Sequence, residues 1–95
     1  MDLQFNGEIF EWRGPSPYFF VSVPDEECGA IEAVANEVTY GWGVIPVSAQ
    51  LGSTQWTTSL FPKEGGYLVP LKDKVRAAEG LELGDVVSIR LTVDV

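Results

Sequence analysis

Apolar and polar residues alternate along several short segments of this chain, which is the pattern of strands with one buried face. The first such segment covers residues 2–13, in which every second residue from Leu3 to Ile9 faces one side. The last segment shows the same period, with apolar residues at Val87, Ile89, Leu91 and Val93. Both parts of the chain therefore predict strands that each send one row of side chains into a core.

Turn residues mark off further strands between these two. Gly-Pro-Ser-Pro at 14–17 indicates a turn, and Gly52-Ser53 suits a two-residue hairpin loop. Pro46 cannot donate a backbone hydrogen bond, so its strand is expected at a sheet edge or with a bulge. The strands predicted before the final one cover residues 2–13, 18–23, 44–51, 54–61 and 67–71.

Two segments have helical rather than alternating periodicity. The longer one follows Pro24 and three acidic residues, which suit a helix N-terminus. Its apolar residues recur at spacings of three and four, namely Cys28, Ile31, Val34, Ala35 and Val38. The shorter helix covers residues 72–79, with Val75 and Ala78 expected to face inward, and Gly80 is placed to end it in a left-handed conformation.

These elements predict a mainly β fold, a small closed or nearly closed β-barrel of six or seven mostly antiparallel strands with two short helices. The chain has 95 residues, of which 45% are apolar, and this length favours a single domain over 1–95.

The charge of the chain narrows the classes of partner. The net charge is −8, which disfavours binding to phosphate backbones and so argues against a nucleic-acid partner. The segment 63–76 carries a local charge of +2. No signal peptide and no apolar run long enough to span a membrane are visible, and the single Cys28 fits a reducing compartment, so a cytoplasmic location is expected.

The chain contains no histidine, which removes the usual catalytic triads and most zinc sites. Cys28 is expected to be a buried apolar residue, and no metal and no cofactor are predicted. Ser59 could act as a nucleophile only with a lysine such as Lys72 as its base, whereas a serine in a strand is usually a packing residue.

Lys72 and Arg76 are the preferred binding residues. They are four apart on a short helix, so they project from one face, and Ser59 and Tyr67 are expected nearby. Together these groups could hold a carboxylate or a phosphate. In the competing interpretation, Arg76 pairs with Glu79, Asp85 or a strand carboxylate and only fixes the helix to the barrel.

Large rings provide a second candidate surface. They are Trp12, Tyr18, Trp42, Trp56, Phe61 and Tyr67. Core packing explains most of them, but Trp12 and Trp56 are candidates to line a cleft beside Lys72 and Arg76 that would suit a ring-bearing ligand or a peptide.

The combined motifs resemble the domain-of-unknown-function family 1905 of small bacterial and archaeal proteins. The residues that carry the resemblance are Phe5 to Trp12, Phe20-Val21-x-Val23-Pro24, Thr58-Ser59-Leu60-Phe61-Pro62, Gly66-Tyr67-x-x-Pro70-Leu71-Lys72, Val75-Arg76 and Gly80-Leu81-x-x-Gly84-Asp85. The resemblance implies a small β-barrel, sometimes fused to a bacteriocin-protection-type domain, and it implies no activity.

The sequence thus favours a cytoplasmic binding or interaction module with an anion-leaning site near the second helix. Its partner would be a small anionic ligand or a protein, and the chain would be a monomer or weak homodimer. An enzyme or enzyme accessory that acts on a small anionic substrate is the alternative, and a DNA-binding dimer is the third and least favoured class.

Overall fold

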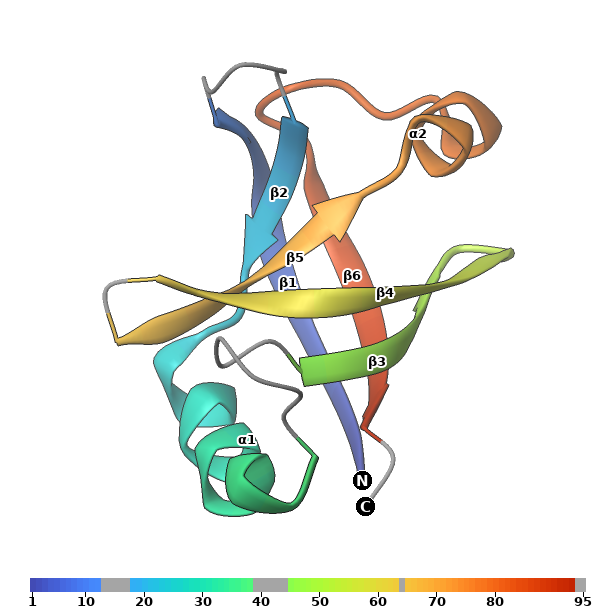
Figure 1. Cartoon of the computed structure of the whole chain (residues 1–95). Coiled ribbons are helices and arrows are strands. Elements are labelled where there is room, and N and C mark those ends of the chain that lie inside the picture. The colour runs from blue at the N-terminus through green and yellow to red at the C-terminus, as the bar shows by residue number, and fades with distance from the viewer. Residues whose placement is uncertain (13–17, 39–44, 64, 94–95) are drawn as a thin grey trace.

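The computed structural model describes residues 1–12, 18–38, 45–63 and 65–93 (Figure 1). Six strands and two helices lie in these ranges. In chain order they are β1 (Asp2–Trp12), β2 (Tyr18–Ser22), α1 (Asp25–Val38), β3 (Ile45–Leu51), β4 (Thr54–Lys63), β5 (Gly66–Leu71), α2 (Asp73–Glu79) and β6 (Val86–Val93).

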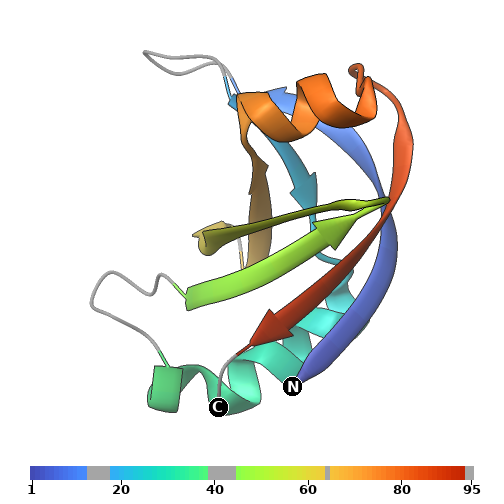
Figure 2. The same cartoon turned by 90° about the vertical axis from the view of Figure 1, so that its right-hand side faces the viewer.

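The strands form a closed barrel in the order β1-β2-β5-β4-β3-β6, and all neighbouring strands are antiparallel. The predicted fold class is therefore confirmed. β1 is long enough to serve both neighbours, since residues 2–8 pair with β6 and residues 9–12 pair with β2. The two helices lie at opposite ends of the barrel, and the described ends of the chain lie close together beside α1 (Figure 2).

The residues that alternate along each strand in the sequence face alternately the inside and the outside of this barrel. The inward residues of β6 and β3 are buried, as the period of two predicts. The largest fully buried side chains come from strands far apart in the chain, and among them are Ile9, Ile45, Leu60, Ile89 and Leu91. The core thus contains residues of β1, β3, β4 and β6, and its formation depends on closure of the barrel.

Pro46 does not mark an edge strand, and that expectation is wrong, because β3 pairs with β4 on one side and β6 on the other. The physical reason lies in the register. Pro46 is opposite Ser59 of β4, but pairing with β6 begins only at Val47, opposite Val93. Pro46 therefore lies just beyond the β6 ladder, where the proline does not interrupt it.

Both helices begin and end where the sequence predicts, within a residue. Gly80 follows α2 with a φ of 62°, and the Leu81 N–H donates to the carbonyl of Arg76 at 3.0 Å. Val75 is buried as expected, but Ala78 is exposed, which corrects the expected inward face. The side chain of Glu79 turns toward the barrel instead, and the Thr54 hydroxyl donates to its carboxylate at 2.6 Å.

Candidate functional site

Several apolar side chains lie on the outside of the barrel. Phe20 and Leu68 are only 8% and 6% exposed, yet neither belongs to the cluster of residues that fills the core. Since Val21 and Val69 beside them face inward, strand alternation turns Phe20 and Leu68 outward. We call the outer surface that they share with their cross-strand neighbours the aromatic face, and its residues are Phe10, Phe20, Phe61, Leu68 and Pro70.

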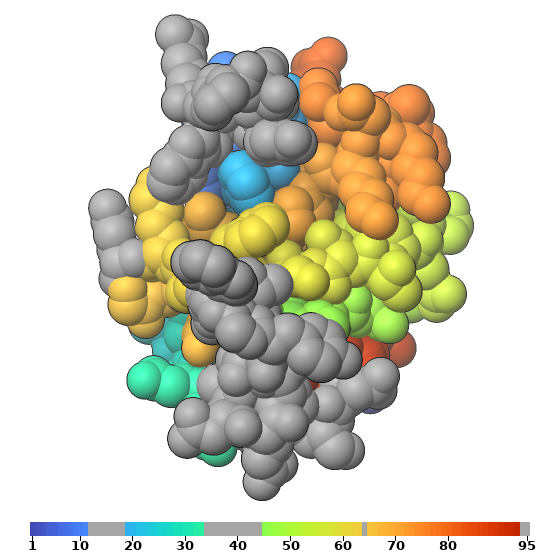
Figure 3. Space-filling view, viewed as in Figure 1, coloured from blue at the N-terminus to red at the C-terminus, as the bar shows by residue number. Residues whose placement is uncertain are grey.

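The rings of the aromatic face contact one another across three strands. The centroids of Phe10 and Phe20 are 6.2 Å apart, and those of Phe20 and Phe61 are 6.4 Å apart with the rings nearly perpendicular. The edge-to-face arrangement of Phe20 and Phe61 is favourable beyond the area that the two rings bury. Phe61 is nevertheless 43% exposed, so part of its ring remains open to water. Yellow atoms of β4 lie at the surface on the face of the molecule that Figure 3 shows.

A hollow of about 470 Å³ lies next to these rings, at the side where the chain leaves β5 for α2. Phe20, Phe61, Pro70 and Leu71 give it an apolar floor, while Thr58, Lys72 and Asp73 add polar groups. We call this hollow the aromatic groove. Its volume lies in the range of sites that take small ligands or single side chains, and it combines apolar walls with a few polar groups, as binding sites do.

Lys72 is exposed beside the groove, and among the described residues no carboxylate lies within ion-pair distance of it. Asp73, which also lines the groove, lies 3.3 Å from the Arg76 guanidinium. The stretch 72–76 carries three cations and one anion within a protein of net charge −8. An acidic group in the groove would therefore meet a locally positive surface.

Arg76 lies behind this surface rather than in the groove. Its guanidinium carbon is 3.3 Å from the centroid of the Phe19 ring, and its Nε is buried without a hydrogen-bond partner in the described part of the chain. Its ion pair is with Asp73, not with Glu79 or Asp85 as the sequence suggested. Phe19 is a core residue, so Arg76 fixes α2 to the barrel.

Arg76→Ala is expected to lower the free energy of unfolding by about 1–2 kcal/mol, because the contact with the Phe19 ring is lost. Arg76→Lys should recover only part of this loss, since an ammonium group does not stack as a planar guanidinium does. Asp73→Ala should leave the urea midpoint almost unchanged, because this carboxylate is fully exposed. Full stability in Arg76→Lys would show that charge alone holds the helix.

Of the other polar candidates, Tyr67 does not lie near Lys72. Ser59 is half-buried on β4, two residues before Phe61 and on the same side of the strand. Tyr67 lies at the opposite end of β5, five residues before Lys72, which in an extended strand corresponds to about 16 Å. The proposed group of Ser59, Tyr67 and Lys72 is therefore not brought together as one site.

Tyr67 instead packs near Cys28 at the α1 end of the barrel. Burial raises the pKa of the Cys28 thiol, and nearby carboxylates of α1 add to the effect. Burial also raises the pKa of the Tyr67 hydroxyl, with Glu32 as the next contribution. The Cys28 thiol donates to the carbonyl of Val23 at 3.3 Å, so this cysteine is a buried packing residue, as expected.

The two tryptophan candidates have different outcomes. Trp56 is 4% exposed and belongs to the core, and its indole N–H donates to the carbonyl of Pro70 at 3.4 Å. It therefore supports the groove from inside the barrel. The side chain of Trp12 lies outside the described residues, as do Trp42 and the turn at 14–17.

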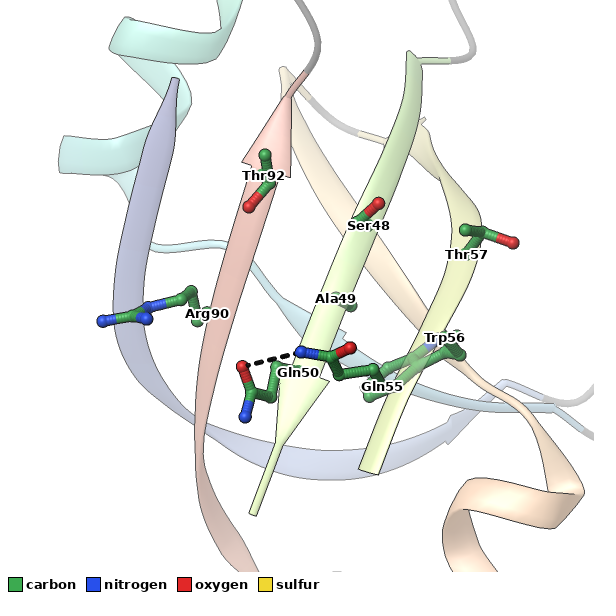
Figure 4. A pocket seen from close by; sticks show the side chains of 8 residues that line it. All are labelled: Ser48, Ala49, Gln50, Gln55, Trp56, Thr57, Arg90 and Thr92. Atoms are coloured by element: carbon green, nitrogen blue, oxygen red, sulfur yellow. Dashed lines mark hydrogen bonds between the residues drawn. The ribbon is translucent and has the colours of Figure 1, made fainter. Parts of the chain in front are cut away.

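A second hollow of about 270 Å³ lies on the outer face of β6, β3 and β4 (Figure 4). Its side chains are mostly amides and hydroxyls, and Gln55 donates to Gln50 at 3.3 Å across the strands. Arg90 extends away from this pair toward β1 (Figure 4). This surface is a polar exterior, without the exposed rings of the aromatic face.

Sequence reasoning found Phe61 and Lys72 but missed Phe10, Phe20 and Pro70. In the sequence Phe61 shares one face of its strand with Gln55, Thr57 and Ser59, and a phenylalanine is unexpected in such a polar row. Phe20 could not be assigned, because it lies in a continuous apolar run in which alternation cannot be read. A search for rings at outward positions of adjacent strands would have found the aromatic face.

Comparison with known proteins adds a family. A model of a domain of unknown function, DUF1905, matches residues 5–91, nearly the whole chain. No curated protein matches the sequence. Across the described ranges, neither helix has the length and apolar character needed to cross a membrane. The same ranges contain no cluster of three or more side chains that could hold a metal ion.

Proposed function

The chain belongs to the DUF1905 family of domains of unknown function, and we propose that it is a binding module whose ligand occupies the aromatic groove. The ligand class that fits is an apolar or aromatic group that carries a negative charge. The observation that carries the proposal is the partly exposed Phe61 ring. This ring makes an edge-to-face contact with Phe20 beside a hollow of about 470 Å³ that Lys72 also lines.

The exposure of Phe61 favours a ligand with an apolar part. Phe61 is 43% exposed on the outside of the barrel, and the contact of an apolar ring with water is unfavourable. An apolar group bound against this ring would remove part of it from water, which favours binding. Phe20 and Pro70 extend this surface into the groove, so a ring of the ligand would contact protein on more than one side.

Lys72 favours a ligand that also carries a negative charge. Asp73 is engaged by Arg76, which leaves the Lys72 ammonium as the charged group beside the groove that has no carboxylate partner in the described ranges. A carboxylate on the ligand would gain the modest free energy of a surface ion pair, about 0–1 kcal/mol. Apolar contact would therefore provide most of the affinity, and Lys72 would provide selectivity for anions.

The test is an NMR titration of the ¹⁵N-labelled protein with 3-phenylpropionate and, in parallel, with its uncharged amide. We expect shifts that concentrate on Phe20, Phe61 and Lys72, with weaker binding of the amide. Phe61→Ser should weaken binding of both compounds by more than about tenfold, since it removes most of the apolar contact.

Lys72→Gln should weaken only the carboxylate, by about twofold to fivefold. Lys74→Gln is the matched control, because it removes the same charge from an exposed residue of α2 that does not line the groove. Equal effects of the two lysine variants would show that only the overall charge matters. Shifts elsewhere on the barrel, unaffected by Phe61→Ser, would overturn the proposed site.

A further inference from the structure

We infer that the hydroxyl of Thr58 binds the carboxylate of the ligand at the inner end of the aromatic groove, so that the ligand is an arylalkanoate held by its ring at one end and by its carboxylate at the other. This inference rests on the proposed function and names its ligand class. It begins from an irregularity in β4: Thr58 is the polar residue of an otherwise apolar inward row, and it is only half-buried.

The side chain of Thr58 faces the inside of the barrel. Its cross-strand partner on β3 is Val47, a core residue, and directly opposite residues of paired strands share a face. The neighbours of Thr58 in the inward row, Trp56 and Leu60, are both buried. Thr58 is less buried than either, so solvent reaches an inward-facing position of β4 at this residue.

The aromatic groove accounts for this access. In its lining, Phe20, Phe61 and Pro70 belong to the outward aromatic face. Thr58 and Leu71 line the same hollow but face inward, and Leu71 is a core residue. The hollow therefore extends from the aromatic face toward inward-facing residues, and Thr58 lies at its inner end.

The groove has an apolar and a polar end. Phe61 of β4 is opposite Leu68 of the antiparallel β5, so residues before Phe61 run alongside residues after Leu68. Thr58 consequently lies toward the same end of the groove as Lys72, the end at α2 toward which β5 runs in Figure 1. Three residues of extended strand, about 10 Å, separate Phe61 from Thr58. A ligand with a ring at one end and a polar group at the other fits this division.

The Thr58 hydroxyl is available to such a polar group. In the described part of the chain this hydroxyl makes no hydrogen bond, so it is open to water or to a ligand atom in the groove. A threonine hydroxyl has one proton to donate, and it donates most strongly to a charged acceptor. Thr58 therefore favours a carboxylate over an uncharged amide at this position.

Thr58 and Lys72 differ in how strongly they bind a carboxylate. Lys72 is exposed, and water and salt weaken the attraction of an exposed ion pair. Thr58 is partly shielded from water, where a hydrogen bond to a charged group is stronger. The Asp73 carboxylate at the same end is compensated by the Arg76 guanidinium at 3.3 Å. We therefore expect Thr58 to contribute more than Lys72 to the selection of carboxylates.

The test is an NMR titration of the whole ¹⁵N-labelled chain with 3-phenylpropionate and with its uncharged amide. Thr58→Val keeps the shape of the side chain and removes the hydroxyl, so the Kd for 3-phenylpropionate should rise by about tenfold. This is more than the twofold to fivefold expected for Lys72→Gln, and the Kd of the amide should rise by less. Thr58→Ser retains the hydroxyl and should bind to within about threefold of the wild type.

Thermal unfolding of the same variants separates this role from a structural one. A hydroxyl that serves only the ligand is not needed by the fold, so Thr58→Val should melt at the temperature of the wild type or above it. Thr57→Val is the matched control, because Thr57 is exposed and lines the polar hollow of Figure 4 but not the aromatic groove. Thr57→Val should leave both Kd values unchanged.

Three outcomes would overturn the inference. If Thr58→Val binds 3-phenylpropionate as tightly as the wild type, Thr58 does not bind the carboxylate, even though weaker binding by Phe61→Ser would leave the proposed function intact. If Thr58→Val melts at a lower temperature and weakens both compounds equally, Thr58 is a packing residue. If neither compound shifts Phe20 and Phe61, the proposed function itself fails and this inference with it.

Discussion

Leu60→Ala is expected to destabilise the protein by about 2–5 kcal/mol, which for a domain of this size lowers the melting temperature by roughly 10–30 °C. Leu60 is fully buried and belongs to the barrel core, so the truncation leaves a cavity in it. The ladder between β4 and β5 is also the shortest in the barrel, with only three residue pairs. Thermal unfolding followed by circular dichroism measures the effect.

Phe61→Ala is the matched control for this experiment, because it truncates the very next residue of the same strand. Its side chain points outward and is 43% exposed, so we expect a loss of about 1 kcal/mol or less. Phe61→Ala should instead weaken binding of 3-phenylpropionate by about tenfold, whereas Leu60→Ala should retain binding below its melting temperature. Comparable losses of stability in both variants would mean that Phe61 is a core residue and not part of a binding surface.

Gly7→Ala is the second variant with a large expected effect, a loss of about 1–3 kcal/mol through overpacking. A Cβ at Gly7 would clash with Cγ1 of Val21, a fully buried core residue of β2. Gly7 is opposite Val87 of β6, two residues before β1 begins to pair with β2 at Ile9, so the chain needs close approach of two strands at this point. Urea denaturation should show a lower midpoint with an unchanged slope.

Gly29→Ala provides the opposite result as a control. Gly29 is exposed within α1, and a Cβ there would meet no atom within 4 Å. Replacing a glycine in a helix interior by alanine should stabilise the protein by about 0.5–1 kcal/mol. If Gly7→Ala were as well tolerated as Gly29→Ala, the closure of the barrel at β1 would be looser than the structure indicates.

The candidate site was only partly visible in the sequence. The charge of Lys72 and the outward position of Phe61 are local properties, readable from the residues on either side. The role of Arg76 was not readable, because the partner that decides it is the ring of Phe19, more than fifty positions earlier in the chain. Tyr67 and Lys72 are far apart because β5 is extended between them. The predicted strand over residues 67–71 already implied this separation, but Tyr67 and Lys72 were grouped by residue type alone.

By itself, the sequence determined the elements of this protein and the face that most strands bury. Alternation over a few residues, Gly80 at a helix end and Gly52-Ser53 at a hairpin are local causes that act before any tertiary contact. Only the tertiary structure decided which strands meet, how far each ladder extends and where the rings of Phe10, Phe20 and Phe61 gather. Register between distant strands depends on closing long loops and filling one shared core, so the position of Pro46 just past the end of the ladder with β6 was decided only by the tertiary structure.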